Sequence, residues 1–265
     1  MFELSSALSG ETGQCFHIGG RWVSPSGIRR TPVASPSTEM ELLPVPLGDT
    51  RDVDRAVAAA RTAFDHGPWP RMSAPERAAH LRWPADEVRR RLRLAARLWT
   101  AQVGAPVAFA EGLVQAGGSR FDHFAELAGS YAFHDRRPTF RGHARVIREP
   151  VGVAALFAPW NATFSILAYK IPAALAADCA VVVKSPPEGP LDTLVVAECA
   201  AAAELPPGVV NVITADREES RALAASPERG QDQLHRERAD GPLAAVGHPV
   251  APGPTGASRT GKRTR

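Results

Sequence analysis

The chain has 265 residues, of which 44% are hydrophobic and 22% are charged, a composition typical of globular proteins. No window approaches about eighteen consecutive apolar residues, so we expect no transmembrane helix. Residues 1–30 lack a basic stretch followed by an apolar one, so we expect no secretory signal. The three cysteines, Cys15, Cys179 and Cys199, do not fit a disulfide scaffold or a multi-cysteine zinc site. These features favour a reduced, cytoplasmic environment.

The net charge of +3 is unevenly distributed along the chain. Lys and Arg outnumber Asp and Glu in residues 229–265, whereas the rest of the chain is nearly neutral. Arg259, Lys262, Arg263 and Arg265 form a small basic cluster without interleaved aromatic residues. Nucleic-acid-binding proteins combine such charge with a recognisable module. The sequence therefore predicts neither nucleic-acid binding nor membrane binding.

The amino-terminal part predicts a short hairpin followed by a capped helix. Residues 1–14 are small and polar, and we expect them to be disordered. Apolar residues around a Gly-Gly pair predict a hairpin over residues 16–23. Asp49 or Thr50 is expected to cap a helix. The apolar stripe of that helix is Val53, Val57, Ala60 and Phe64.

Two longer helical segments follow, and each contains residues that disfavour a continuous helix. Ser73 is expected to cap the first segment, and Pro84 is expected to kink or divide it. Residues 107–134 also have helical spacing, which the glycine pair at 117–118 is expected to interrupt. Residues 139–148 alternate weakly between polar and apolar and predict an exposed strand.

After residue 150 the chain predicts a parallel sheet. Three continuous apolar runs, separated by helical segments, predict strands that are buried on both faces: 151–158, 180–183 and 209–213. Alternation of strands and helices is typical of a doubly wound α/β fold. Ligands of such sheets bind beyond the carboxyl ends of the strands. Those ends carry Pro159-Trp160-Asn161, Lys184-Ser185 and Thr214-Ala215.

These strand ends carry motifs in a distinctive order. PWN, KIPAALAA, VVVK with the turn that follows it, and LPPGVVNV all occur within residues 150–215. In this order and spacing they resemble the NAD(P)-dependent aldehyde dehydrogenase superfamily. The resemblance extends back through GGRWV (19–23) and DVDRAVAAARTAF (52–64). It covers about residues 15–228, which correspond to the amino-terminal half of a family member.

The resemblance implies a fold and a reaction. Residues 151–228 are expected to form part of a Rossmann-like cofactor domain, a partial doubly wound sheet. Residues 15–138 supply its amino-terminal hairpin and helices, and residues 139–150 supply an oligomerisation-arm strand. Family members oxidise aldehydes to carboxylic acids with NAD or NADP. A cysteine thiolate attacks the aldehyde, hydride passes to the cofactor, and a glutamate-activated water hydrolyses the thioester.

The resemblance also assigns site residues. Asn161 resembles the oxyanion-hole asparagine, whose amide donates to the developing alkoxide, although by itself it also fits a cap of the following helix. Lys184 resembles the lysine that binds the adenosine ribose, although it also fits a solvated lysine at a strand end. Pro159 and Trp160 resemble residues whose backbone borders the cofactor. Glu188 lies one residue away from the position of a ribose-binding glutamate in many members.

The catalytic cysteine and the general-base glutamate of the family lie farther downstream than the resemblance reaches. Cys179 and Cys199 are expected to be small buried hydrophobes, and Cys15 precedes the first hairpin. None of the three is expected to be the nucleophile, and no glutamate matches the general base. The histidines show no metal-ligand spacing, and we expect no metal.

Residues 229–265 no longer resemble the family. They are rich in Pro and Gly and predict disorder. From Arg229 to Ala257, every residue except Thr255 has codons that begin with G or C, as expected when a GC-rich gene is read out of frame. Back-translation of residues 229–238, read one base later, yields VDKISFTGS, the family motif that opens the phosphate-binding loop. The sequence therefore predicts a frameshift caused by one extra base near codon 228.

Such a truncation predicts a chain without nucleophile, general base or phosphate-binding loop, and hence without dehydrogenase activity. It is also expected to leave a buried parallel strand as an unpaired edge. The alternative is a non-catalytic fragment that associates with intact relatives, or with further copies of itself, through the strand within residues 139–149. Neither the aldehyde nor the choice between NAD and NADP follows from the sequence.

Overall fold

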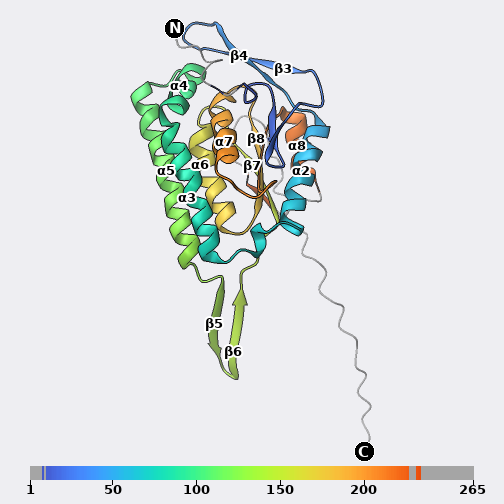
Figure 1. Ribbon diagram of the computed structural model, residues 1–265, viewed down its shortest axis with the longest axis vertical. Helices are drawn as coiled ribbons and strands as arrows, with labels where there is room; N and C mark the ends of the chain where they lie inside the picture. Colours follow the sequence, from blue (N-terminus) through green and yellow to red (C-terminus); the bar gives the residue numbers. More distant parts are fainter. Residues whose placement is uncertain (1–7, 9, 227–230, 234–265) are drawn as a thin grey trace, which may run out of the picture. The chain divides into compact units, whose positions relative to one another are not determined.

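The computed structural model describes residues 8, 10–226 and 231–233, and its centre is a six-stranded sheet (Figure 1). The strand order is β10-β7-β8-β9-β1-β2. Neighbouring pairs from β10 to β9 are parallel, whereas β1 is antiparallel to both β9 and β2. The strands are β1 (Phe16–Ile18), β2 (Arg21–Val23), β7 (Val153–Phe157), β8 (Ala180–Ser185), β9 (Val210–Thr214) and β10 (Gln231–Gln233). The predicted α/β fold with a parallel sheet is confirmed.

Helices cover both faces of this sheet, as its apolar runs predicted. Every residue of β7, β8 and β9 is buried, because alternate side chains enter two separate hydrophobic cores. One core contains α2 (Thr50–Asp65) and α8 (Arg217–Ala225). The other contains α6 (Thr163–Ala176) and α7 (Leu191–Ala202), which lie side by side in Figure 1.

A further layer of helices packs on α6 and α7. It consists of α3 (Ala74–Arg90), α4 (Leu92–Val103) and α5 (Val107–Ser130), and the 3₁₀ turn η1 (Trp69–Arg71) precedes it. Of the two effects expected at Pro84, a kink or a division, the division is wrong, because α3 continues through Pro84 to Arg90. The expected interruption at 117–118 is also wrong, because α5 is continuous there. A Cβ on Gly117 would lie 2.7 Å from the Phe164 ring, so this glycine permits close packing of α5 on α6.

The predicted helix starts agree with the structure. Asp49 caps α2, and its side chain accepts hydrogen bonds from the amides of Arg51 and Asp52. Ser73 caps α3 in a capping box with Glu76. The hairpin predicted over residues 16–23 is formed by β1 and β2.

The amino-terminal segment differs from its prediction. Residues 1–14 were expected to be disordered, but Leu8 is buried in the core and residues 10–14 form turns. The Thr12 side chain is fully buried, and its hydroxyl donates to a carboxylate oxygen of Glu198 on α7 at 2.8 Å. Residues 1–7 and 9 lie outside the described residues. A second hairpin, β3 (Arg30–Ala34) and β4 (Glu41–Pro46), follows β2.

The predicted arm is a hairpin rather than one strand. β5 (His134–Thr139) pairs antiparallel with β6 (Gly142–Ile147), and the two project from the body of the molecule in Figure 1. The element therefore begins before residue 139. Phe140, at the turn, is 99% exposed.

The expectation that a buried parallel strand would be left as an unpaired edge is also wrong for β7. β10 pairs parallel with β7, and Gln231 lies opposite Ala154. Three residues of the segment predicted to be disordered are thus a strand. Residues 229–230 and 234–265 of that segment lie outside the described residues.

Candidate functional site at the carboxyl ends of the strands

The carboxyl ends of β7, β8 and β9 meet at one edge of the sheet. Phe157 lies opposite Lys184, Lys184 lies opposite Ile213, and Ser185 lies opposite Thr214. The strands therefore end at nearly the same level. The PWN turn leaves β7 here, Lys184 lies near the end of β8, and Ala215 follows β9. Parallel α/β sheets bind ligands at this edge.

The PWN turn presents Asn161 at the surface. Asn161 is exposed, and Trp160 is 45% exposed. The cap position of α6 is occupied by Ala162, so the interpretation of Asn161 as a helix cap is wrong. No hydrogen bond to the Asn161 side chain occurs within the described part of the chain. Its amide is therefore available to donate to an oxygen atom of a ligand.

The backbone of the turn, in contrast, is held firmly. The Thr163 hydroxyl donates to the carbonyl oxygen of Pro159 at 2.8 Å. The Trp99 indole donates to the carbonyl oxygen of Asn161 at 3.1 Å. Gly189 packs directly on the turn, because a Cβ there would lie 2.6 Å from the Trp160 carbonyl oxygen.

Lys184 is buried rather than solvated at its strand end. Only 8% of the residue is exposed, and burial lowers the pKa of its ammonium group. The carboxylates of Glu188, Asp216 and Glu219 oppose that decrease in pKa. Across the described residues, the Lys184 ammonium has no hydrogen-bond partner and no carboxylate within 4 Å, although the backbone of Lys184 pairs within the sheet. A desolvated donor of this kind fits a polar, oxygen-rich ligand. Glu188 is exposed in the following turn.

Lys170 is a titratable group of this region that the sequence analysis missed. It lies on α6, two helical turns after Thr163, and its ammonium donates to the carbonyl oxygen of Phe157 at 2.7 Å. Burial lowers the pKa of Lys170 to about 8. The sequence signal that could have found it is its spacing from the PWN turn. Two helical turns place Lys170 on the same face of α6 as Thr163, and this face is directed at the end of β7.

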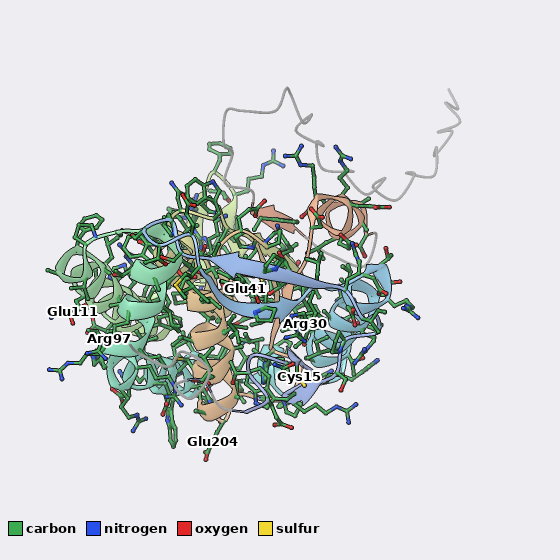
Figure 2. All side chains as sticks on the ribbon, turned by 90° about the horizontal axis from the view of Figure 1, so that it is seen from above. Cys15, Arg30, Glu41, Arg97, Glu111 and Glu204 are labelled. Carbon is green, nitrogen blue, oxygen red and sulfur yellow. The ribbon has the colours of Figure 1, made fainter. Side chains whose placement is uncertain are left out.

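The cysteines lie in positions that do not suit a nucleophile beside Asn161. Cys179 precedes β8 and therefore lies at the opposite edge of the sheet, and burial raises the pKa of its thiol. Cys199 lies inside α7, where burial raises its pKa to about 12. Cys15 lies just before β1, among the amino-terminal strands in Figure 2. β1 is three strands from β7, about 14 Å across the sheet.

The described residues contain neither a metal-binding cluster nor a membrane-spanning helix. Within residues 8, 10–226 and 231–233, no group of three or more His, Cys, Asp or Glu side chains could hold a metal ion. No helix in the same ranges is long and apolar enough to cross a membrane.

The aldehyde dehydrogenase family model matches residues 22–230. The chain belongs to this family. Geranial dehydrogenase of Castellaniella defragrans is 39% identical over 216 residues, which are 81% of this chain and 45% of that relative. Betaine aldehyde dehydrogenase 1 of Oryza sativa subsp. japonica is 35% identical over 79% of this chain and 43% of that relative.

Solved aldehyde dehydrogenases have the same fold. The NAD-dependent enzyme of Sinorhizobium meliloti superposes with a TM-score of 0.79 at 31% identity, over 83% of this chain and 44% of that one. An enzyme of Mycobacterium tuberculosis in complex with NAD+ also gives 0.79, at 34% identity, over 83% of this chain and 46% of that one. This aldehyde dehydrogenase chain spans less than half the length of these relatives. Asn161, Lys184 and Glu188 lie within the matched residues, whereas Cys15 lies outside them.

Proposed function

We propose that this chain supplies the cofactor-binding and oxyanion-binding half of an NAD(P)-dependent aldehyde dehydrogenase, which oxidises an aldehyde to a carboxylic acid. One observation carries the proposal. Lys184 is a largely buried residue whose ammonium has no hydrogen-bond partner in the described chain, and it lies at the ligand-binding edge of a parallel sheet. Hydroxyl oxygens of the adenosine ribose would satisfy it. The NAD+ complex of the Mycobacterium tuberculosis relative supports this class of cofactor.

Asn161 is the proposed electrostatic element of the reaction. When bound, NAD(P)+ accepts the hydride that leaves the aldehyde carbon. The exposed amide of Asn161 donates to the carbonyl oxygen as negative charge develops there, which stabilises the transition state. Pro159 and Trp160 are proposed to border the cofactor through their backbone. Glu188 is the second proposed ribose-binding residue, because it lies exposed in the turn that follows Lys184 at this edge.

We further propose that the chain as written is inactive because its reading frame is shifted after residue 228. No described cysteine combines proximity to Asn161 with a reactive thiol. The alternative reading of residues 229–238 as VDKISFTGS supports a continuing cofactor domain in the other frame. The three cysteines that the structure describes are all free, which fits our proposal of a cytoplasmic location.

Cofactor binding by the existing chain tests the role of Lys184. Saturation-transfer difference NMR detects weak binding of NAD+ and NADP+ through the ribose and adenine protons. We expect signals with the wild-type chain and their loss in Lys184→Ala. Arg97→Ala, a change on α4 rather than at the strand ends, is the control and should retain them. Equal signals in both variants would refute the assignment of Lys184.

The frameshift requires a separate experiment at the level of the gene. Resequencing codons 224–235 of the source DNA reveals whether the extra base is present. Deletion of one base near codon 228 should then produce a longer protein that reduces NAD(P)+ with aldehydes. A longer product that folds but shows no such activity would contradict the proposed reaction.

A non-catalytic role is the second candidate, and the hairpin favours it. Among the described strands, β5 and β6 pair only with each other, so each keeps a free outer edge. Such edges can pair with another copy or with an intact relative. Co-purification of the tagged chain with a full-length family member should occur and should be lost when residues 134–147 are deleted. Unchanged co-purification after that deletion would exclude the hairpin as the contact.

A further inference from the structure

A buried carboxylate, that of Asp192, contacts the start of the helix that follows the PWN turn. It has no part in the roles described above. Asp192, in the first turn of α7, is completely buried. One of its oxygens accepts a hydrogen bond from the Phe164 amide at 2.9 Å, and the other accepts from the Gln102 side chain at 3.0 Å. A buried carboxylate is costly unless hydrogen bonds satisfy it, and these contacts offset part of that cost.

The first contact supplies a cap that α6 lacks in its own sequence. Ala162 occupies the cap position and has no side chain that could accept a hydrogen bond. The amides of the first helical turn need acceptors, and negative charge is favourable at a helix amino terminus. Asp192 therefore caps α6 from the neighbouring helix. Its position fixes where α6 starts, and hence where the PWN turn ends.

The second contact connects Asp192 to α4. The Gln102 side chain donates to Asp192 through its NH₂ group and accepts from the Leu191 amide at 2.7 Å through its carbonyl oxygen. Both groups of the side-chain amide are therefore hydrogen-bonded. Trp99 lies three residues earlier and therefore on the same face of α4. Its indole donates to the carbonyl oxygen of Asn161. One helix face thus holds both the turn itself and the acid that caps the helix after it.

These contacts involve the backbone of the turn and leave the Asn161 side chain free. We propose that Trp99, Gln102 and Asp192 form a brace that positions the Asn161 amide for its oxygen ligand. The brace rests on the proposed function of Asn161. Oxyanion donors act only when they are already oriented, so displacement of this turn would weaken catalysis without removing any group that touches the substrate. The three are positioning residues.

The test uses the full chain labelled with 5-fluorotryptophan. ¹⁹F NMR gives separate resonances for Trp99 and Trp160, which are assigned with Trp99→Phe and Trp160→Phe. Trp160 is half exposed in the turn and reports its position. We expect Trp99→Phe to shift the Trp160 resonance. Trp69→Phe is the matched control, since Trp69 is buried and its indole nitrogen has no partner in the described residues; it should not shift that resonance.

Asp192 and Gln102 are tested by mispairing and repair. In Asp192→Asn the new amide group faces the Gln102 amide group, so two donors oppose each other and the Trp160 resonance should shift. Adding Gln102→Glu restores a donor–acceptor pair and should return the resonance to its wild-type position. The repair would show that this hydrogen-bonded pair, rather than either side chain by itself, sets the position of the turn. Thr193→Ala, a buried neighbour whose hydroxyl has no described partner, is the control.

The outcomes separate the brace from the proposed function. An unchanged Trp160 resonance in both Trp99→Phe and Asp192→Asn would overturn the brace. A shift in Asp192→Asn without repair by Gln102→Glu would overturn the roles of Asp192 and Gln102. Circular dichroism identifies a variant that has unfolded. If Asp192→Asn unfolds, the Trp160 resonance of the double variant with Gln102→Glu tests the brace instead. Failure of NAD+ to bind the wild-type chain would instead refute the proposed function and would not alter the ¹⁹F results.

Discussion

The buried Asp192 carboxylate predicts a specific dependence of stability on pH. Burial raises the pKa of Asp192 from its ordinary value of 3.8 to about 6 in the folded chain. Its facing groups are the Gln102 side chain and backbone amides, and no charged side chain contributes to this pKa. The folded state therefore binds the proton more tightly than the unfolded state. Stability from this source is present below pH 3.8 and is lost as the pH rises through about 6.

The magnitude follows from the two pKa values. Their separation corresponds to about 3 kcal/mol in total, of which about 2 kcal/mol falls between pH 4.5 and pH 7.5. Asp192→Asn cannot titrate at this position, so the difference in unfolding free energy between wild type and variant isolates the effect. We expect the wild type to lose about 2 kcal/mol relative to the variant over this range.

Urea unfolding followed by tryptophan fluorescence at four pH values measures this difference. Other titrating groups are common to both proteins and cancel. A difference that stays constant within about 0.5 kcal/mol from pH 4.5 to 7.5 would refute the reasoning. An increase with pH would show that the hydrogen bonds from Phe164 and Gln102 outweigh desolvation.

Three further predictions concern other parts of the fold. Gly112→Ala should stabilise the exposed face of α5 by about 0.5–1 kcal/mol, whereas Gly117→Ala, which meets the Phe164 ring, should destabilise by about 1–3 kcal/mol in urea unfolding. Thr12→Val should cost about 1.5–3 kcal/mol if the amino-terminal segment is docked through Glu198, and no loss would contradict that docking. Lys170 should titrate near pH 8 in NMR of ¹³C-dimethylated protein, and a midpoint near 10 would show that it is not desolvated.

The sheet and its ligand-binding edge could be predicted because their signals are local. Each central strand is one uninterrupted apolar run, and the residue types change abruptly where it ends. Asn161 and Lys184 stand at those changes, so their shared edge followed from the topology alone. Burial of Lys184 could not be predicted, because it depends on α8 and on segments more than a hundred residues away.

The wrong predictions share a physical cause, which is contact between distant segments. Thr12 is buried beside Glu198, to which its hydroxyl donates, and a polar segment gives no sign of such a partner. Pro84 does not divide α3, because packing of the helix against α5 maintains it. The brace was missed for the same reason. Gln102 and Asp192 are ordinary polar residues until the fold brings them together.

The pairing of β10 with β7 has a consequence for how gene damage affects this fold. Gln231, Asp232 and Gln233 are polar residues in a segment that does not resemble the family, yet they occupy a place in a parallel ladder. Such a ladder is made by amide and carbonyl groups, which every non-proline residue carries. Backbone pairing at the outer position of the sheet therefore depends little on which residue types occupy it. The frameshift that we propose would therefore still allow a strand to pair with β7, and we expect it to abolish activity without removing this strand.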